Sequence, residues 1–378
     1  MGDRKRIVVC GSGRIGRAVG LLLREIESQV EVDVYFGDLY KEAAESAAQW
    51  VRSDREGLVE AFQMPAEGFD ATTEEIFEKG DLVLDCLPGS QAPRIARAAR
   101  QHGLHYVNIT EYVRETEEIV QLAQGAETGF LLQTGLAPGF INVLGVDLLR
   151  KFQKRFQVEK IDRLAMRVGA LTRSVVAPHF YGFTWSPIGV ATEYVKPTLV
   201  VRDHEKRECQ ALSERATLIV DGLTLEEDFT SGGVADLCDA FAGQVRHMDY
   251  KTLRYPGHFG WVDQQLENIP DGPTRSTELD RVMQGAIPQM DDDVVIIHAY
   301  AEGVGQDGYR HQMAKSYRIE PETIGPQRLS AIQSTTAAGM AESAYLLLTE
   351  NPKGVVLQSA IDPEKFMAGP FVSRIYGN

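Results

Sequence analysis

A glycine-rich turn near the N-terminus constrains the fold of this chain more than any other stretch. The segment RIVVCGSGRIGRAVG, Arg6 to Gly20, places glycines at G-x-G-x-x-G spacing directly after an apolar run and before a helical pattern. In a dinucleotide-binding fold the first glycine permits a tight turn, the second lets backbone N–H groups approach a pyrophosphate, and the third lets helix and strand pack closely. The positive end of the helix then faces the phosphates. The alternative is an ordinary strand-to-helix turn in an α/β protein that binds no nucleotide.

The next predicted strand, VDVYFGD, ends in an acid that favours the nucleotide interpretation. Asp38 lies about twenty residues beyond the glycines, where a carboxylate binds the hydroxyls of the adenosine ribose. A carboxylate there also repels a 2′-phosphate, and neither Leu39 nor Tyr40 supplies a cation for one. NAD is therefore favoured over NADP, and the alternative is that Asp38 serves only as a helix cap.

A later segment, LDCLPGSQAP from Leu84 to Pro93, follows another apolar run and turns at Pro88 and Gly89. In a parallel sheet this turn is expected beside the second ribose of a bound dinucleotide, with Ser90 as the N-cap of the next helix. The predicted cofactor site combines the glycine turn, the acid and this backbone: Gly11, Ser12, Gly13, Arg14, Ile15, Gly16, Asp38, Cys86, Leu87 and Pro88.

The remaining pattern predicts two domains, as the length of 378 residues also suggests. Short apolar runs alternate with amphipathic stretches as far as Gly135, which predicts an α/β fold with a Rossmann-type doubly wound parallel sheet. Beyond it, alternating runs with longer connections and a hairpin at VGQDG predict a second α+β domain with a mixed, mainly antiparallel sheet. We expect the C-terminal helix to fold back on the first domain. The expected NAD-binding domain is therefore residues 1–140 and 328–378, and the substrate-binding and dimerisation domain is 141–327.

Charge and composition exclude several classes of protein. The net charge of −15 argues against binding to nucleic acid or to an anionic membrane, and favours a small-molecule partner. The N-terminal apolar run is too short for a signal peptide, and no stretch approaches the ~18 apolar residues of a membrane span, so a cytoplasmic location is expected. Cys10, Cys86, Cys209 and Cys238 form no CxxC pair and have no histidine cluster near them, so neither disulfides nor a bound metal is expected.

Three central segments carry a resemblance to a known family. GLAPGFINVLGVDLL, TWSPIGVATEYVKPTLVVRD and KTLRYPGH occur in an order and spacing that resemble the saccharopine dehydrogenase-like family, most closely its lysine 6-dehydrogenase branch. The apolar Ala137 in GLAPG is shared with that branch, whereas saccharopine reductases of the eukaryotic type carry an acid there. The resemblance implies a Rossmann domain, a second domain that dimerises, and oxidation or reduction of a C–N bond by a nicotinamide cofactor.

This chemistry directs attention to particular side chains in the second domain. An amine with a pKa of about 10.4 must lose a proton before its carbon can give up hydride, so the site needs a base. His258, Lys251 and His179 are the candidate catalytic bases, although each could instead be a structural or solvated side chain. Arg254 is the candidate for binding a substrate carboxylate, or else a surface ion-pair residue. Further candidates for substrate contacts are Trp185, Tyr181 and Glu193, with Tyr194 beside them.

Three functions remain open at this point. The first is oxidative deamination of an amino acid by NAD, as in lysine 6-dehydrogenases. The second is reductive condensation of saccharopine or carboxynorspermidine dehydrogenase type, for which Arg173 or Arg202 would supply a second anion site. The third is a non-catalytic NAD-binding sensor. A sugar dehydrogenase is disfavoured because its Glu-Lys-Pro motif does not follow the predicted fifth strand.

Overall fold

The computed structural model describes residues 4–110 and 113–377, which form two compact units. The first unit comprises the N-terminal residues up to Phe140, Glu322–Leu329 and the residues from Gln333 onward. The second comprises Ile141–Pro321 and Ser330–Ile332. The first unit is therefore discontinuous in sequence, and its C-terminal segment is part of its fold.

A seven-stranded parallel sheet forms the centre of the first unit, in the order β17-β6-β5-β4-β1-β2-β3. This order confirms the predicted doubly wound Rossmann sheet, because the chain reverses its direction of travel between β1 and β4. The carboxyl ends of these two neighbouring strands carry the glycine turn and the turn at Pro88. The strands are β1 (Lys5–Cys10), β2 (Val32–Asp38), β3 (Val59–Gln63), β4 (Leu82–Asp85), β5 (His105–Asn108), β6 (Gly129–Leu131) and β17 (Gly354–Val356).

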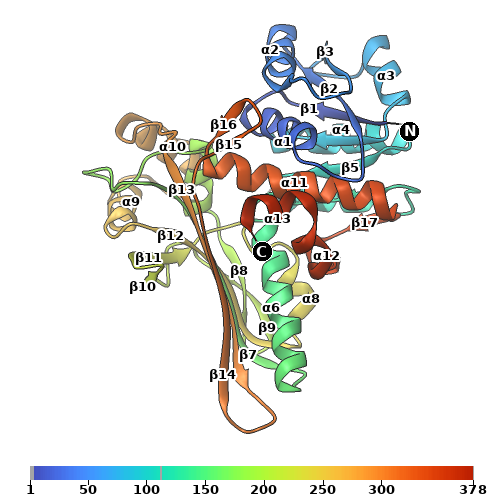
Figure 1. Ribbon diagram of the computed structural model, residues 1–378. Helices are drawn as coiled ribbons and strands as arrows, with labels where there is room; N and C mark the ends of the chain where they lie inside the picture. Colours follow the sequence, from blue (N-terminus) through green and yellow to red (C-terminus); the bar gives the residue numbers. More distant parts are fainter. Residues whose placement is uncertain (1–3, 111–112, 378) are drawn as a thin grey trace. The chain divides into compact units, whose positions relative to one another are not determined.

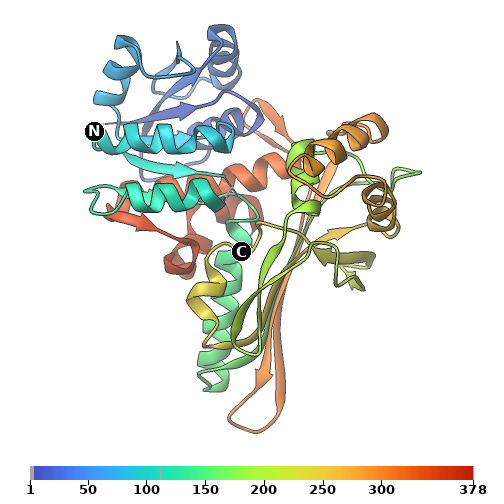
Figure 2. The same ribbon diagram turned by 180° about the vertical axis from the view of Figure 1, so that it is seen from behind.

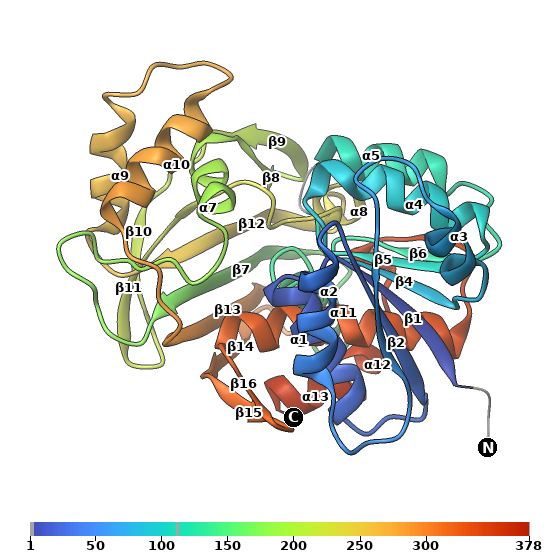
Figure 3. The same ribbon diagram turned by 90° about the horizontal axis from the view of Figure 1, so that it is seen from above.

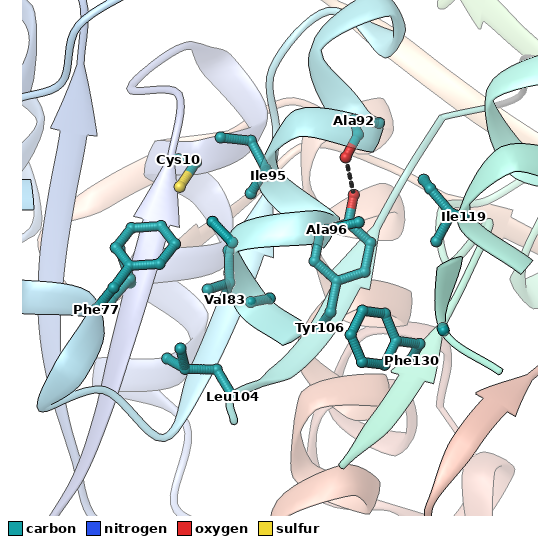
Figure 4. Close-up of a cluster of buried hydrophobic side chains, with 14 of the residues drawn as sticks. Cys10, Phe77, Val83, Ala92, Ile95, Ala96, Leu104, Tyr106, Ile119 and Phe130 are labelled. Atoms are coloured by element: carbon teal, nitrogen blue, oxygen red, sulfur yellow. Dashed lines mark hydrogen bonds between the residues drawn. The ribbon is translucent and has the colours of Figure 1, made fainter. Parts of the chain in front are cut away.

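Helices cover both faces of this sheet. Figure 1 shows α1 and α11 in front of it, and Figure 2, from behind, shows α4 and α5 over the other face. Between the sheet and α4 lies a core of Cys10, Val83, Ile95, Tyr106 and Phe130, drawn in Figure 4. The helices are α1 (Arg14–Glu25), α2 (Lys41–Val51), α3 (Ala71–Glu78), α4 (Ala92–Gln101), α5 (Val113–Leu122), α11 (Ala331–Glu350), α12 (Pro363–Ala368) and α13 (Pro370–Tyr376), with short 3₁₀ turns at Gly89–Gln91 and Gln358–Ala360.

The C-terminal segment joins the first unit through backbone and ring contacts. Strand β17 pairs in parallel with β6 and so becomes an edge strand of the sheet. The rings of Phe140 and Tyr376 stack with centroids 3.6 Å apart. Gly339 of α11 lies so close to the preceding loop that an added Cβ would be 2.7 Å from the carbonyl oxygens of Thr134 and Gly135. The small residues at the start of this helix therefore permit close packing on a loop. A two-stranded hairpin, β15 (Glu322–Ile324) and β16 (Gln327–Leu329), completes the unit.

The second unit is built on an eight-stranded mixed sheet whose main path is β10-β11-β12-β7-β13-β14, with β8 paired to β12 and β9 to β8. All pairs are antiparallel except β12 with β7, which confirms the expected mixed, mainly antiparallel sheet. The predicted hairpin is β13–β14. The strands are β7 (Ile161–Thr172), β8 (Thr198–Arg202), β9 (Glu205–Cys209), β10 (Ala216–Val220), β11 (Leu223–Phe229), β12 (Val245–Arg254), β13 (Asp293–Val304) and β14 (Arg310–Ile319).

Two groups of helices pack on this second sheet. The long α6 (Phe140–Phe156) lies along the strands, and its Gly145 allows Met166 of β7 to approach closely. Figure 3 shows α7, α9 and α10 gathered at one end, where they share an apolar cluster that includes Tyr181, Tyr194 and Phe259. Their bounds are α7 (Pro187–Val195), α8 (Leu237–Phe241), α9 (His258–Leu266) and α10 (Arg275–Ala286).

Candidate functional site

Each of the three glycines of the first turn has its own structural role. Gly11 has φ +99°, in the region that favours glycine, and an added Cβ would lie 3.0 Å from the carbonyl of Cys86. A Cβ on Gly16 would lie 2.0 Å from the Gly11 oxygen, so strand and helix could not pack as they do. Gly13 has no described atom within 4 Å of such a Cβ. The first and third glycines therefore serve packing, and the second leaves room for a ligand.

The residues around this turn fit a dinucleotide. Gly13 is the N-cap of α1, with no capping side chain and no acid in the first turn, so the positive end of the helix is not neutralised locally. Ser12 is buried, and its Oγ has no hydrogen-bond partner among the residues that the structure describes. Arg14 and Ile15 open the helix beside it.

Asp38 lies against the glycine turn, as the ribose-binding interpretation requires. Its Oδ2 accepts a hydrogen bond from the Ser12 amide at 2.8 Å, and its Oδ1 accepts one from the Tyr40 amide at 3.2 Å. No cation of the described residues forms an ion pair with this carboxylate, which fixes the turn while remaining half-buried. The following side chains, Leu39 and Tyr40, are exposed.

The Cys86–Pro88 turn at the end of β4 packs against the same glycines. Cys86 donates its amide to the Cys10 oxygen at 2.8 Å, and the Leu87 side chain is 3.2 Å from the Cβ position of Gly11. The prediction that Ser90 is a helix N-cap is wrong: it lies inside a 3₁₀ turn, and Gln91 occupies the N-cap of α4. The structure thus brings together all the predicted cofactor residues at neighbouring strand ends of the first unit.

In the second unit, Tyr194 connects two of the predicted site residues. Its hydroxyl accepts a hydrogen bond from Arg254 Nε at 2.7 Å and lies 3.1 Å from His258 Nε2. His258 Nδ1 donates to the His179 carbonyl at 2.9 Å, so Nε2 of the neutral ring is the acceptor and takes the proton of the Tyr194 hydroxyl. The Arg254 guanidinium also lies over the Tyr181 ring, 4.7 Å from its centroid.

Burial controls the charges of this cluster. Burial, followed by the nearby charge of Arg254, lowers the pKa of His258 to about 3, so its ring is neutral at physiological pH. Burial also raises the pKa of Tyr194 above its usual value, against the opposing effect of Arg254. His258 is not a solvated side chain, because it is fully buried and is the first residue of α9. Arg254 is likewise buried and is not a surface ion-pair residue.

Lys251 is not part of the Tyr194 cluster. Successive residues of a strand point to opposite faces, so Lys251 and Arg254 of β12 lie on different sides of the sheet. The Lys251 ammonium lies 3.4 Å from Glu227 and 3.7 Å from Glu214, and 4.8 Å from the Phe229 ring centroid. It belongs to a buried ion network with Arg167 and Asp249, which are paired at 2.7 Å.

The other predicted contacts surround the cluster at different depths. His179 is half-buried, with its ring centroid 4.6 Å from that of Trp261. Tyr181 is buried, and its hydroxyl has no hydrogen-bond partner among the described residues. Trp185 packs against Gly189 of α7, and Glu193 is half-buried on the same helix.

A cavity of about 310 Å³ is lined in part by Tyr194. It is formed by the end of α7, the loop after β9, α9 and the start of α10, and among its lining residues are Leu212, Asp263, Glu267 and Arg275. The two arginines proposed as second anion sites are engaged by carboxylates of the chain itself. Arg173 pairs with Glu320 at 3.2 Å, and Arg202 pairs with Asp249 at 3.1 Å and Glu214 at 3.0 Å.

No cluster of three or more potential metal ligands occurs in residues 4–110 and 113–377. The four cysteines are free thiols. Within the same ranges, no helix combines the length and the apolar character needed to cross a bilayer.

Comparison with known proteins agrees with this architecture. The family model of the saccharopine dehydrogenase NADP binding domain matches residues 7–131, and that of the saccharopine dehydrogenase C-terminal domain matches residues 135–375. The mitochondrial alpha-aminoadipic semialdehyde synthase of Mus musculus is 21% identical over 210 residues, which are 52% of this chain and 20% of that protein. The chain thus spans about a fifth of the length of this relative.

Solved structures share the fold at low sequence identity. Apo saccharopine dehydrogenase (L-Glu forming) from Saccharomyces cerevisiae superposes with a TM-score of 0.72 at 14% identity, covering 96% of both chains. Homospermidine synthase from Legionella pneumophila, solved in complex with NAD, gives a TM-score of 0.68 at 13% identity, covering 100% of this chain and 90% of that one. Because the C-terminal domain model alone covers more than half of the chain, the protein belongs to the saccharopine dehydrogenase family.

Proposed function

We propose that the protein is an NAD-dependent oxidoreductase that oxidises the C–N bond of an amino acid, in the manner of a lysine 6-dehydrogenase. The observation that carries the choice of NAD is the Asp38 carboxylate, hydrogen-bonded to the Ser12 amide at the end of β2. A negative charge at this place favours two free ribose hydroxyls and disfavours a 2′-phosphate. The exposed Leu39 and Tyr40 add no positive charge next to it.

The proposed reaction converts a primary amine into an imine. Bound NAD supplies the acceptor for the hydride that leaves the amine-bearing carbon. The substrate ammonium first gives one proton to a base, the oxidised carbon forms a C=N bond to the nitrogen with loss of a second proton, and water then releases a carbonyl compound and ammonia. The protein's part is to orient the substrate, hold its carboxylate and accept a proton.

The Arg254–Tyr194–His258 cluster is the proposed substrate-orienting centre. Arg254 keeps a guanidinium charge in a buried place, and His258 is held in one tautomer by Tyr194 and the His179 carbonyl. His179 itself is half-buried and is the more accessible imidazole. We therefore assign proton acceptance to His179, give His258 the role of holding the His179 carbonyl, and treat Lys251, which lies on the other face of β12, as the weaker candidate.

Reductive condensation is the second candidate, and the resemblance to a saccharopine dehydrogenase and a homospermidine synthase supports it. It would require a second anion site, and the pairing of Arg173 and Arg202 with carboxylates of the chain argues against these two residues in that role. A non-catalytic NAD-binding sensor is the third candidate.

Initial rates of NADH and NADPH formation at about pH 9, where more of the amine is deprotonated, separate these functions. The substrates are L-lysine, other amino acids, diamines and saccharopine. Turnover with lysine and NAD supports the proposal, whereas activity only in reverse, with a keto acid plus an amine, supports condensation. Cofactor binding without any turnover supports the sensor.

Asp38→Asn tests the assignment of the cofactor. Loss of the charge should weaken NADH binding by about tenfold to a hundredfold, since a hydrogen bond to a charged group contributes about 1.5–3 kcal/mol. It should also narrow the preference for NADH over NADPH. Fluorescence titration with both reduced cofactors measures this. An unchanged ratio of the two dissociation constants would remove Asp38 from the site.

Two further assignments are proposals of the same kind. We propose that the second unit binds the amino-acid or amine substrate and that the protein forms a homodimer through it. Light scattering coupled to size-exclusion chromatography measures the mass in solution. A mass of one chain at the concentration of the assay would contradict the dimer.

A further inference from the structure

The end of β4 carries a buried carboxylate that no predicted role explains. Asp85 is 2% exposed and lies between β1 and β5 in the sheet, opposite Cys10 on one side and Asn108 on the other. Its Oδ2 accepts a hydrogen bond from the Tyr106 hydroxyl at 2.7 Å, and its Oδ1 accepts one from the Leu87 amide at 3.1 Å. Oδ2 thus joins the carboxylate to Tyr106 in the core, and Oδ1 fixes the turn that follows β4.

That turn forms one wall of the candidate cofactor site. The carbonyl of Cys86 and the side chain of Leu87 are the atoms nearest to the Cβ position of Gly11, at 3.0 and 3.2 Å. The Leu87 amide, which Asp85 fixes, therefore sets how closely the turn approaches the glycine loop. A shift of this turn by a few tenths of an ångström would change the space available beside Gly11.

We propose that Asp85 is a positioning residue for the dinucleotide: it does not touch the cofactor, but its ionised carboxylate fixes the Cys86–Pro88 turn against the glycine loop. This inference rests on the proposed function, because it assumes that a dinucleotide binds there. It gives Asp85 a role in binding in addition to the roles of the glycine turn and of Asp38 at the end of β2.

The surroundings of Asp85 make its charge state responsive to pH. Burial raises the pKa of Asp85 to about 6, while the hydrogen bonds from Tyr106 and Leu87 and the charge of Arg94 lower it by less. The titratable and charged groups facing it are Cys10 of β1, Cys86 after its own strand, Tyr106 of β5 and Arg94 of α4. Burial raises the pKa of both thiols and of the phenol, so these three stay neutral while the carboxyl titrates.

Protonation then weakens the hold on the turn. A neutral carboxyl offers only an uncharged acceptor oxygen, so the hydrogen bond from the Leu87 amide becomes weaker. Tyr106 has a second acceptor within reach, the Ala92 oxygen at 3.3 Å, shown by the dashed line in Figure 4. The Leu87 amide has no such second acceptor among the described residues.

The effect of Asp85 on stability has the opposite sign, which separates the two roles. Its folded-state pKa of about 6 lies above the ordinary value of 3.8, so its contribution to folding becomes more favourable as the pH falls through 6. If Asp85 acted only through stability, cofactor affinity would change with pH in the same direction as its contribution to stability. Positioning predicts that affinity falls with decreasing pH while the contribution of Asp85 to stability rises.

The test is a titration with NADH or NADPH, whichever binds the wild-type protein more tightly, from about pH 7.5 to about pH 5.5. The wild-type dissociation constant should rise about threefold over this range. Asp85→Asn should raise the dissociation constant about tenfold at the upper pH. The dissociation constant of this variant should then stay nearly constant as the pH falls. Tyr106→Phe removes a hydrogen bond that lowers the pKa of Asp85, so the midpoint should move to higher pH.

Two controls isolate the residue. Asp81→Asn changes an acid that precedes β4, at the opposite end of the strand, where it pairs with Lys5, and should keep the wild-type profile. Glu342→Gln removes another carboxyl that titrates near neutral pH and should also keep it. Circular dichroism of each variant records folding, and if Asp85→Asn does not fold, the direction of the Tyr106→Phe shift decides.

A flat wild-type profile with tight binding, or an Asp85→Asn variant that retains the wild-type slope, would overturn the inference and leave the proposed function intact. A wild-type protein that binds neither NADH nor NADPH would instead overturn the proposed function. A downward shift of the midpoint in Tyr106→Phe would also contradict the role of Asp85.

Discussion

At the scale of single residues, Gly13 and Gly16 offer a matched test of the proposed phosphate site at the start of α1. Gly16→Ala places a Cβ 2.0 Å from the Gly11 oxygen, so it should destabilise the protein by about 1–3 kcal/mol, as overpacking does elsewhere. Gly13→Ala meets no described atom within 4 Å and has φ −70°, so it should fold normally. Its methyl group would occupy the space assigned to the pyrophosphate, and we expect NADH to bind at least about tenfold more weakly.

Thermal unfolding and NADH titration of both variants check this prediction. Gly285→Ala, on α10, also adds a methyl group where no described atom lies within 4 Å, and it serves as the control for a harmless substitution. If Gly13→Ala binds NADH as tightly as the wild type, the space above the helix end is not the phosphate site.

Sequence reasoning singles out residues at this scale where a residue type has one dominant reason to occur. The glycine spacing and Asp38 were identified because turn geometry and ribose recognition each need a particular residue. Asp85 and Tyr194 were not assigned central roles, since a strand-end acid and a tyrosine near a helix end have many ordinary uses. Their importance comes from partners distant in the sequence, Tyr106 for one and Arg254 and His258 for the other.

At the scale of elements, the hydroxyl of Tyr194 ties α7 to both β12 and α9. Tyr194→Phe would leave Arg254 Nε and His258 Nε2 without their partner in a buried place, which costs about 1–3 kcal/mol for each unsatisfied group. If the cluster orients the substrate, kcat should also fall by about tenfold or more. Chemical denaturation and steady-state kinetics on the same preparations measure both effects.

The matched control is Tyr255→Phe, which removes another buried tyrosine hydroxyl, one that donates to the Thr172 oxygen at 2.9 Å. Tyr255 follows Arg254 directly after β12 and points to the other face of the sheet. This variant should lose stability but keep its kcat. Equal losses of kcat in the two variants would show that the activity follows stability and not the Tyr194 hydroxyl.

The alternation of apolar and polar residues predicted where the helices and strands lie better than it predicted which strands pair. Strands such as β4 and β13 contain short continuous apolar runs, and the changes of period mark the helices of the first unit. Strand β9 was not predicted from the sequence, because its side chains are mostly exposed and charged and show no apolar alternation. The pairing of β17 with β6 and of β12 with β7 depends on contacts far apart in the sequence, which no local pattern encodes.

At the scale of the whole molecule, stability should fall as the pH rises through neutrality. The net charge of −15 contributes self-repulsion, and Glu342 on α11 contributes a specific cost. Glu342 is buried, its Oε2 accepts hydrogen bonds from the Phe371 and Val372 amides at the start of α13, and no described group donates to its Oε1. Burial raises the pKa of Glu342 from 4.5 to about 7, against the smaller effect of those two amides.

The sign of the effect follows from this shift. The folded state holds the Glu342 proton more tightly than the unfolded chain, so this group favours folding most at a pH below 4.5 and loses that contribution as the pH rises through about 7. Glu342→Gln keeps a carbonyl oxygen for the two amides and removes the buried charge. It should therefore be more stable than the wild type by about 2 kcal/mol at about pH 8, with the difference vanishing near about pH 5.

Urea unfolding at both pH values, with Glu350→Gln as the control, measures this difference. Glu350 ends the same helix, is exposed and pairs with Lys365, so its loss changes the net charge equally without removing a buried charge. Because both variants reduce self-repulsion by the same amount, only the buried site can make Glu342→Gln more stable than Glu350→Gln at the higher pH. A stabilisation of equal size in the two variants would assign the effect to net charge, and a loss of stability in Glu342→Gln alone would show that the ionised carboxylate is needed to hold α13 on the first unit.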